Sequence, residues 1–198
     1  MSKIHQFADY DQYLETERRG SRYRMNRRPT ANKHSVRLIA DYLQQHYSSP
    51  LSILCHGARD GTEVRLFRGV FPEAKVLGTD VFTKGSPDVI EWDYHRQKPE
   101  WVNHWDLIYS NSLDHSPKPE EGLVTWIEQL NPTGSLFLVW TFSHQLNDKP
   151  QLPFPGGDCF GATLHEYIDL LRKAGEMKDL LWVGGSLGEV ILIAGKKP

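Results

Sequence analysis

The stretch Leu51–Val64, LSILCHGARDGTEV, decides the fold of this chain. Its apolar first residues predict a buried strand, its two glycines four positions apart predict a turn, and the residues after Gly61 predict a helix. Ligands of parallel α/β sheets bind beyond the carboxyl ends of the strands. We therefore expect the loop from Gly57 to Gly61 to lie beside a ligand.

Strand and helix patterns alternate after this stretch. The strands are expected within residues 74–80, 88–93, 105–112 and 135–142, with helices at 61–71, 119–130 and 162–175. Residues 131–134 predict a turn by composition, and residues 179–195 read as a closing hairpin. Strands separated by helices favour an α/β protein of three layers with a mostly parallel sheet and an antiparallel C-terminal hairpin.

The first 50 residues predict an N-terminal helical, basic extension, with helices at 7–19 and 33–47, ahead of a core domain at 51–198. Eight Lys or Arg and no Asp or Glu fall between Arg18 and Arg37, whereas the whole chain has a net charge of −2. The basic segment either packs on its own acidic domain or attracts an anionic substrate. Nucleic acid is the less favoured partner, because no nucleic-acid motif is recognised in the segment.

Composition is that of an ordinary globular protein, with 39% hydrophobic and 24% charged residues among 198. The longest apolar run is far shorter than the roughly 20 residues of a membrane helix. The N-terminus lacks the apolar segment of a signal peptide. Two cysteines, Cys55 and Cys159, suit a reducing compartment. We expect a cytoplasmic protein of one cofactor-binding domain, without a membrane partner.

The glycine loop excludes two common cofactor classes. A phosphate-binding loop needs Gly-Lys-Ser/Thr, but Thr62 and Glu63 follow Gly61. A dinucleotide fingerprint counted from Gly57 needs glycine at positions 59 and 62, where Arg59 and Thr62 stand. A cofactor without phosphate is therefore favoured.

From Leu51 to Gly195 the chain resembles the class I S-adenosylmethionine-dependent methyltransferases. The segments that carry the resemblance are ILCHGARDGTEV, VLGTDVF, IEWDYH, WDLIYSNSLDHS, LNPTGSLFLVW and the closing hairpin. The resemblance implies a Rossmann-like, seven-stranded sheet and S-adenosyl-L-methionine as the cofactor. The family's loop has an acid and then three alternate glycines; this chain keeps Gly57 and Gly61 but has Cys55 and Arg59 at the acidic and middle positions.

The resemblance also implies a role for each matching residue. Asp80 would accept hydrogen bonds from the ribose hydroxyls, and Asp93 from the adenine amino group; for either aspartate the alternative is a turn or helix cap. Apolar and aromatic residues would flank the adenine, and Asp60 and the residues after the fourth strand would shape the methionine end. The implied cofactor site comprises Gly57, Asp60, Gly61, Asp80, Val81, Phe82, Asp93, Tyr94, Ser110 and Asn111.

On the acceptor side, Asp114 and His115 are the catalytic candidates, because a histidine there can accept a proton near neutral pH. The alternative is that Asp114 caps the next helix and His115 packs against the cofactor. The loop at residues 143–161 is expected to line the acceptor pocket or to lie outside it. No metal is predicted, since His95, His104 and His115 are not at ligand spacing on one helix.

These observations predict a methyltransferase that transfers a methyl group by in-line displacement to an unidentified small-molecule or anionic acceptor. A catalytically silent module that binds S-adenosylmethionine or S-adenosylhomocysteine is the alternative that the altered loop leaves open. A nucleotide-sugar or NAD-linked enzyme is a third, which the failed dinucleotide spacing disfavours.

Overall fold

The computed structural model of the protein describes residues 2–25, 33–47, 51–83, 85–145, 158–185 and 188–197. Its main sheet has seven strands in the order β4-β3-β2-β5-β6-β9-β8. The strands are β2 (Ser52–His56), β3 (Lys75–Asp80), β4 (Val89–Glu91), β5 (Trp105–Ser110), β6 (Leu130–Trp140), β8 (Glu176–Gly184) and β9 (Glu189–Gly195).

The five strands from β4 to β6 pair in parallel, whereas β9 pairs antiparallel with both β6 and β8. From β2 the chain adds β3 and β4 on one side and then β5 and β6 on the other. The strand order therefore reverses between β2 and β5, where ligands of such sheets bind. This arrangement confirms the predicted Rossmann-like sheet and its C-terminal hairpin.

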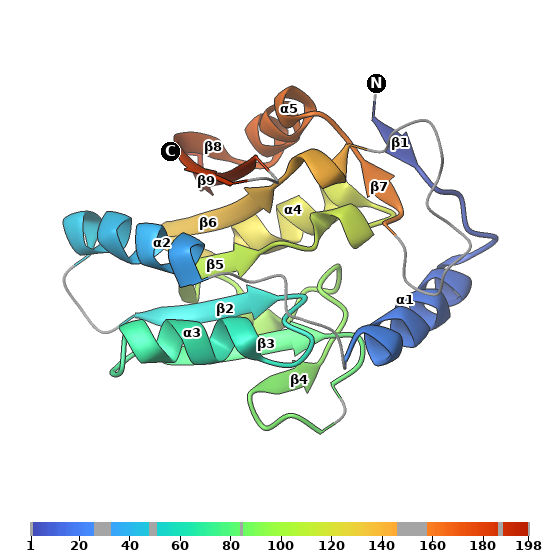
Figure 1. Ribbon diagram of the computed structural model, residues 1–198, viewed down its shortest axis with the longest axis horizontal. Coiled ribbons are helices and arrows are strands. Elements are labelled where there is room, and N and C mark those ends of the chain that lie inside the picture. The colour runs from blue at the N-terminus through green and yellow to red at the C-terminus, as the bar shows by residue number, and fades with distance from the viewer. Residues whose placement is uncertain are drawn as a thin grey trace.

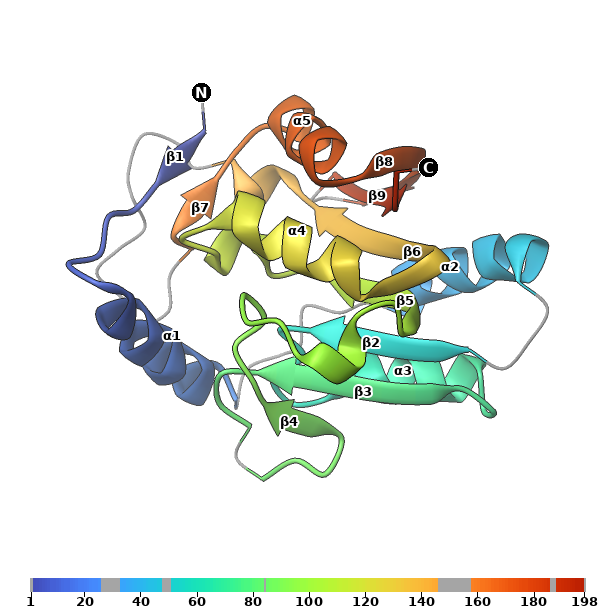
Figure 2. The ribbon, with the colours of Figure 1, turned by 180° about the vertical axis from the view of Figure 1, so that it is seen from behind.

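Helices cover both faces of the sheet (Figures 1 and 2). On one face lie α2 (Lys33–His46) and α3 (Thr62–Val70), and on the other α4 (Pro119–Gln129) and α5 (Leu164–Ala174). Each face has its own core of buried side chains, which include Ile39 and Phe67 on one side and Trp126 and Tyr167 on the other. The apolar spacing of the sequence sets which side of each helix faces the sheet.

Helix α1 (Tyr10–Arg24) lies beyond the carboxyl ends of β2 and β3 (Figure 1). It begins after Asp9, whose side chain accepts a hydrogen bond from the Gln12 backbone N–H, and it runs five residues further than predicted. Ahead of it, β1 (Lys3–Ile4) pairs antiparallel with β7 (Phe160–Gly161), a small sheet that the sequence did not predict. The N-terminal segment is thereby attached to the residues that precede α5.

Three short 3₁₀ turns, η1 (Pro99–Trp101), η2 (Leu113–His115) and η3 (Phe142–His144), complete the described elements. Two of them follow the carboxyl ends of β5 and β6.

The predicted turn at residues 131–134 is wrong in one respect, because β6 already begins at Leu130. Leu130 pairs with Trp105, and the register then shifts so that Ser135 pairs with Leu107. Between these pairs the Asn131 side chain accepts a hydrogen bond from the Thr133 backbone N–H at 3.0 Å. The turn-forming residues thus make an irregularity within the strand rather than a break before it.

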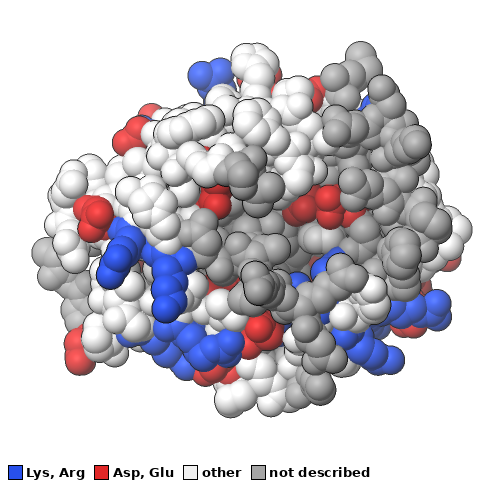
Figure 3. All heavy atoms as spheres, viewed as in Figure 1, with Lys and Arg blue, Asp and Glu red and all other residues white. Residues whose placement is uncertain are grey.

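The residues 1–50, predicted as a helical, basic extension, contain two helices that lie at different places on the sheet. Helix α2 buries Val36, Ile39 and Leu43 in the core with the sheet, whereas α1 lies at the sheet's edge. Lys and Arg side chains gather along the lower edge of the molecule in Figure 3, and acidic atoms are visible near the middle of that face. None of the helices in the described part of the chain combines the length and apolar character needed to span a bilayer.

We predict that the fold loses stability in mild acid through His56. This imidazole is buried at the end of β2, with Nδ1 2.8 Å from Thr79 Oγ1 and Nε2 2.9 Å from Gln129 Oε1. Burial lowers the pKa of His56 to about 4. Because the unfolded chain takes up this proton near pH ~6.5, unfolding becomes easier as the pH falls from there toward the folded pKa.

The expected loss is on the order of 2 kcal/mol between pH 7 and pH 5. Urea unfolding at the two pH values measures it, with His56→Gln as the comparison, since glutamine does not titrate. An equal pH dependence in the wild type and the variant would contradict the assignment to His56.

Candidate functional site

The glycine loop joins β2 to α3 at the carboxyl edge of the sheet. Gly57 and Gly61 both have left-handed backbones, with φ of 73° and 76°. A Cβ on Gly57 would lie 1.9 Å from Ser112 Oγ, so glycine is required there by conformation and by space. Arg59, which replaces the family's middle glycine, also has a positive φ of 39°. The loop therefore keeps a glycine-like path although its middle residue carries a side chain.

Asp80 ends β3 and holds this loop in place. Its Oδ2 accepts a hydrogen bond from the Arg59 backbone N–H at 3.0 Å, and its Oδ1 accepts one from the Phe82 N–H at 3.1 Å. Oδ1 also accepts a 2.8 Å hydrogen bond from Ser21 Oγ of α1. Burial raises the pKa of this carboxyl group, although these hydrogen bonds oppose the shift. Asp80 thus lies at the predicted position and does not face open solvent.

Val81 and Phe82, the predicted adenine surface, contact α1. Val81 packs against the cluster of Tyr13, Leu14 and Cys159. The guanidinium of Arg22 lies 4.9 Å from the centroid of the Phe82 ring. Helix α1 therefore covers the segment that follows Asp80.

Asp93 lies two residues beyond β4 and is also in contact with α1. Its Oδ2 accepts a 2.8 Å hydrogen bond from Tyr10, and its Oδ1 lies 2.9 Å from His95 Nδ1. Burial acts to raise the pKa of Asp93, but His95 and Tyr10 outweigh it and lower that pKa. Tyr94 points into the core, where its ring meets Trp126 edge to face at 5.1 Å.

The other predicted cofactor residues lie around the same loop. Asp60 Oδ1 accepts from the Thr62 N–H at 3.1 Å, and Asp60 precedes Gly61, the N-cap residue of α3. Ser110 ends β5, and its Oγ donates to the His56 carbonyl at 3.2 Å. Asn111 follows directly at the same sheet edge. Asp60 thus lies in the loop after β2, whereas Ser110 ends the adjacent strand β5.

Asp114 and His115 lie on η2, just past β5, and are surrounded by charged groups. Nδ1 of His115 is 3.4 Å from Glu17 Oε2 of α1, and its Nε2 is 3.8 Å from Asp158 Oδ1. Nε2 of His144 is 3.7 Å from Asp114 Oδ2. Burial acts to lower the pKa of His115, but the carboxylates of Asp114 and Glu17 raise it to about 9. In this structure His115 is therefore held in its cationic form near neutral pH.

Sequence reasoning missed the residues that α1 and η3 bring to this site. Glu17 and Ser21 are buried on the same face of α1 as Tyr13. Their spacing along the sequence, which places polar residues on the buried face of a helix, could have indicated that they belong to the site. His144 lies four residues after β6, the strand next to β5 in the sheet. Its place just past a strand end could have indicated that it belongs to the site. The histidines considered together from the sequence are not assembled, since His95 bonds Ser116 Oγ and His104 meets Trp105.

No family model and no curated protein matches the sequence. Similar solved structures are found instead. The 1,6-didemethyltoxoflavin-N1-methyltransferase of Burkholderia thailandensis, solved with 1,6-didemethyltoxoflavin and S-adenosylhomocysteine, has a TM-score of 0.75 at 16% identity. The similarity covers 98% of this chain and 92% of that one.

Two further structures are similar over most of their length. A TehB-like SAM-dependent methyltransferase of Corynebacterium glutamicum has a TM-score of 0.57 at 14% identity, covering 92% of this chain and 98% of that one. The [4+2]-cyclase SpnF has a TM-score of 0.59 at 15% identity, covering 82% and 81%. At these identities the likeness concerns the fold, and the protein has the Rossmann-like fold of the class I S-adenosylmethionine-dependent methyltransferases.

Proposed function

We propose that this protein is an S-adenosylmethionine-dependent methyltransferase that acts on a small molecule. The observation that carries the proposal is Asp80, whose carboxylate joins the end of β3 to the backbone of the glycine loop beside the strand-order reversal. A carboxylate in that position can accept hydrogen bonds from vicinal ribose hydroxyls. The methyltransferase fold of the similar structures supports the same cofactor.

Room for the ribose at Asp80 depends on α1. A carboxylate offers about four lone-pair sites, and three hydrogen bonds from Arg59, Phe82 and Ser21 already reach this one. The two backbone donors belong to the glycine loop (Arg59) and to the segment that follows β3 (Phe82), whereas Ser21 belongs to α1. In our proposal a ribose hydroxyl takes the place of Ser21, and α1 closes over the bound cofactor.

The acceptor would then lie toward η2, between α1 and the ends of β5 and β6. Methyl transfer by in-line displacement depends mainly on aligning the acceptor atom with the methyl group and the sulfur. Asp114 and His115 remain the catalytic candidates, since they follow β5 and are flanked by Glu17 of α1. A small-molecule acceptor is in line with the toxoflavin precursor bound in the Burkholderia structure.

A release assay for S-adenosylhomocysteine separates this proposal from a silent binding module. The [4+2]-cyclase of the same fold gives a reason to run it, because the fold alone does not fix the reaction. Binding of S-adenosylhomocysteine with no turnover on any heteroaromatic, hydroxyl or amine acceptor would favour the silent module.

We predict that Asp80→Asn weakens S-adenosylhomocysteine binding by at least about tenfold, because an amide loses one acceptor and the negative charge. Isothermal titration measures the dissociation constant. The control is Asp106→Asn at the opposite edge of the sheet, where Asp106 Oδ2 accepts from the Ser52 N–H at 2.7 Å. Both variants lose hydrogen bonds at a strand end, but only the first changes the cofactor site. Equal affinities in the two variants would contradict the placement.

We also predict that Gly57→Ala abolishes measurable binding, because the new methyl group collides with Ser112 and the residue has a positive φ. Gly69→Ala is the control, since a Cβ there meets no atom within 4 Å. That helical substitution should raise stability by ~0.5–1 kcal/mol and leave affinity unchanged. Thermal unfolding with and without S-adenosylhomocysteine reports both effects. A ligand-induced rise in Tm that persists in Gly57→Ala would show that the cofactor does not use this loop.

A further inference from the structure

Two histidines and two aspartates face one another on the acceptor side of the site. Asp114 Oδ2 is 3.7 Å from His144 Nε2 and 4.0 Å from His115 Nε2, and that nitrogen is 3.8 Å from Asp158 Oδ1. One ligand atom each of Asp114, His115 and Asp158 lies within 4.8 Å of the others. We call these four residues the His–Asp cluster.

The three histidine–carboxylate distances in the cluster are too long for hydrogen bonds and close to those between ligands of one ion, whereas the Asp114 and Asp158 side chains are within hydrogen-bond reach of each other. Two ligands ~2.1 Å from a tetrahedral metal ion lie about 3.4 Å apart. The three histidine–carboxylate distances exceed this value by less than an ångström. Small rotations would bring the ligand atoms of Asp114, His115 and Asp158 to one ion, and a larger movement of His144, whose Nε2 lies 3.7 Å from Asp114 Oδ2, would add a fourth.

Buried atoms of the cluster also lack partners. Asp114 is 5% exposed and His144 is 8% exposed. Among the described residues, neither Asp114 Oδ1 nor His144 Nδ1 has a hydrogen-bond partner. A buried polar atom without a partner costs free energy and calls for an explanation such as an ion.

The charges around the cluster match a divalent cation. Metal binding requires neutral imidazoles, so an ion would displace the proton that the neighbouring carboxylates hold on His115. The carboxylates of Asp114, Asp158 and Glu17 then carry three negative charges. Arg24 of α1, whose guanidinium lies 3.5 Å from Glu17 Oε2, supplies one positive charge. Two negative charges are left in a buried place, which a divalent ion would neutralise.

The cluster also has the outer contacts of a metal site. A metal-binding histidine usually places its second nitrogen against a carboxylate, and Nδ1 of His115 lies 3.4 Å from Glu17 Oε2. The segments are fixed to one another, since the Ala162 N–H donates to the His144 carbonyl at 3.0 Å. His144 further stacks on Tyr167, with ring centroids 6.2 Å apart.

We propose that Asp114, His115, His144 and Asp158 bind a divalent transition-metal ion, which would meet the acceptor. Two imidazoles with two carboxylates favour zinc, iron, cobalt or manganese over magnesium or calcium, which take oxygen ligands. Such an ion is a Lewis acid that can hold an acceptor oxygen or nitrogen and ease its deprotonation. The geometry of the four side chains supports the metal-binding site by itself, whereas a role of the ion in catalysis depends on the proposed methyl transfer.

This proposal replaces the sequence expectation of no metal. That expectation considered histidines at ligand spacing on one helix. The cluster instead joins η2, η3 and the residues just before β7, which are up to 44 positions apart in the chain. It also gives His115 the role of a ligand in place of that of a proton acceptor.

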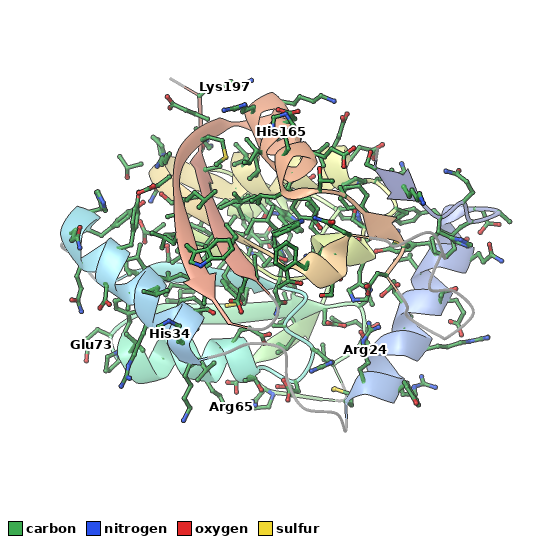
Figure 4. The ribbon with its side chains drawn as sticks, turned by 45° about the horizontal axis from the view of Figure 1, so that its top comes forward. Arg24, His34, Arg65, Glu73, His165 and Lys197 are labelled. Carbon is green, nitrogen blue, oxygen red and sulfur yellow. The ribbon has the colours of Figure 1, made fainter. Side chains whose placement is uncertain are left out.

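Cobalt titration tests the proposal on untagged, chelator-treated full-length protein, followed by visible absorption and isothermal titration. We expect one Co²⁺ per chain with a d–d spectrum typical of nitrogen and oxygen ligands, and competition by Zn²⁺. His144→Ala and Asp158→Asn should each weaken Co²⁺ binding at least tenfold. The control is His165→Ala, which removes an exposed imidazole 3.5 Å from Asp169 on α5. His165 lies away from Arg24 of α1 (Figure 4). This control variant should bind Co²⁺ as the wild type does.

Unchanged Co²⁺ affinity in both cluster variants, or no binding to the wild type, would overturn the proposal and leave His115 with the acid–base role. Circular dichroism and S-adenosylhomocysteine affinity of the metal-free variants show whether they fold. In the wild type, S-adenosylhomocysteine binding without metal binding would reject the ion but not the methyltransferase proposal, because Asp80 and the glycine loop are not part of the cluster.

Discussion

The carboxylate of Asp80 connects the three parts on which the candidate site depends. It accepts hydrogen bonds from the glycine loop, from its own strand end and from α1. The hydrogen bond from Ser21 is buried and the two from the backbone are partly buried, so losing a partner would leave a costly unpaired atom. The loop conformation, the end of β3 and the position of α1 are therefore determined together.

Helix α1 differs from an ordinary amphipathic helix, because the face it buries is partly polar. Ser21 reaches Asp80, Tyr10 reaches Asp93, and Glu17 reaches His115. The helix thus contacts three of the candidate residues along the carboxyl edge of the sheet. Burial of such groups is tolerated only when they are paired, which explains why the helix presents hydroxyl and carboxylate groups rather than aliphatic side chains.

Two chemically different regions meet beneath this helix. At Asp80 the backbone N–H groups of Arg59 and Phe82 oppose a single carboxylate, an arrangement suited to a neutral sugar. At the His–Asp cluster several carboxylates share few cations, an arrangement suited to a positively charged ligand. The division follows the topology, since the first region belongs to β2 and β3 and the second to the segments after β5 and β6.

The sequence by itself determined the layer order, most of the strands and the residues at the strand ends. Alternating helical and apolar patterns depend on local spacing, which is why Gly57, Gly61 and Asp80 lie where their spacing predicted. The bulge at residues 131–134 could not be predicted, because it arises from a register shift against β5. Tertiary structure alone decided that Ser21 meets Asp80 across 59 positions, and that His144 and Asp158 join Asp114. Such contacts depend on where α1 and the strand-end turns pack, and no local pattern in the chain encodes that.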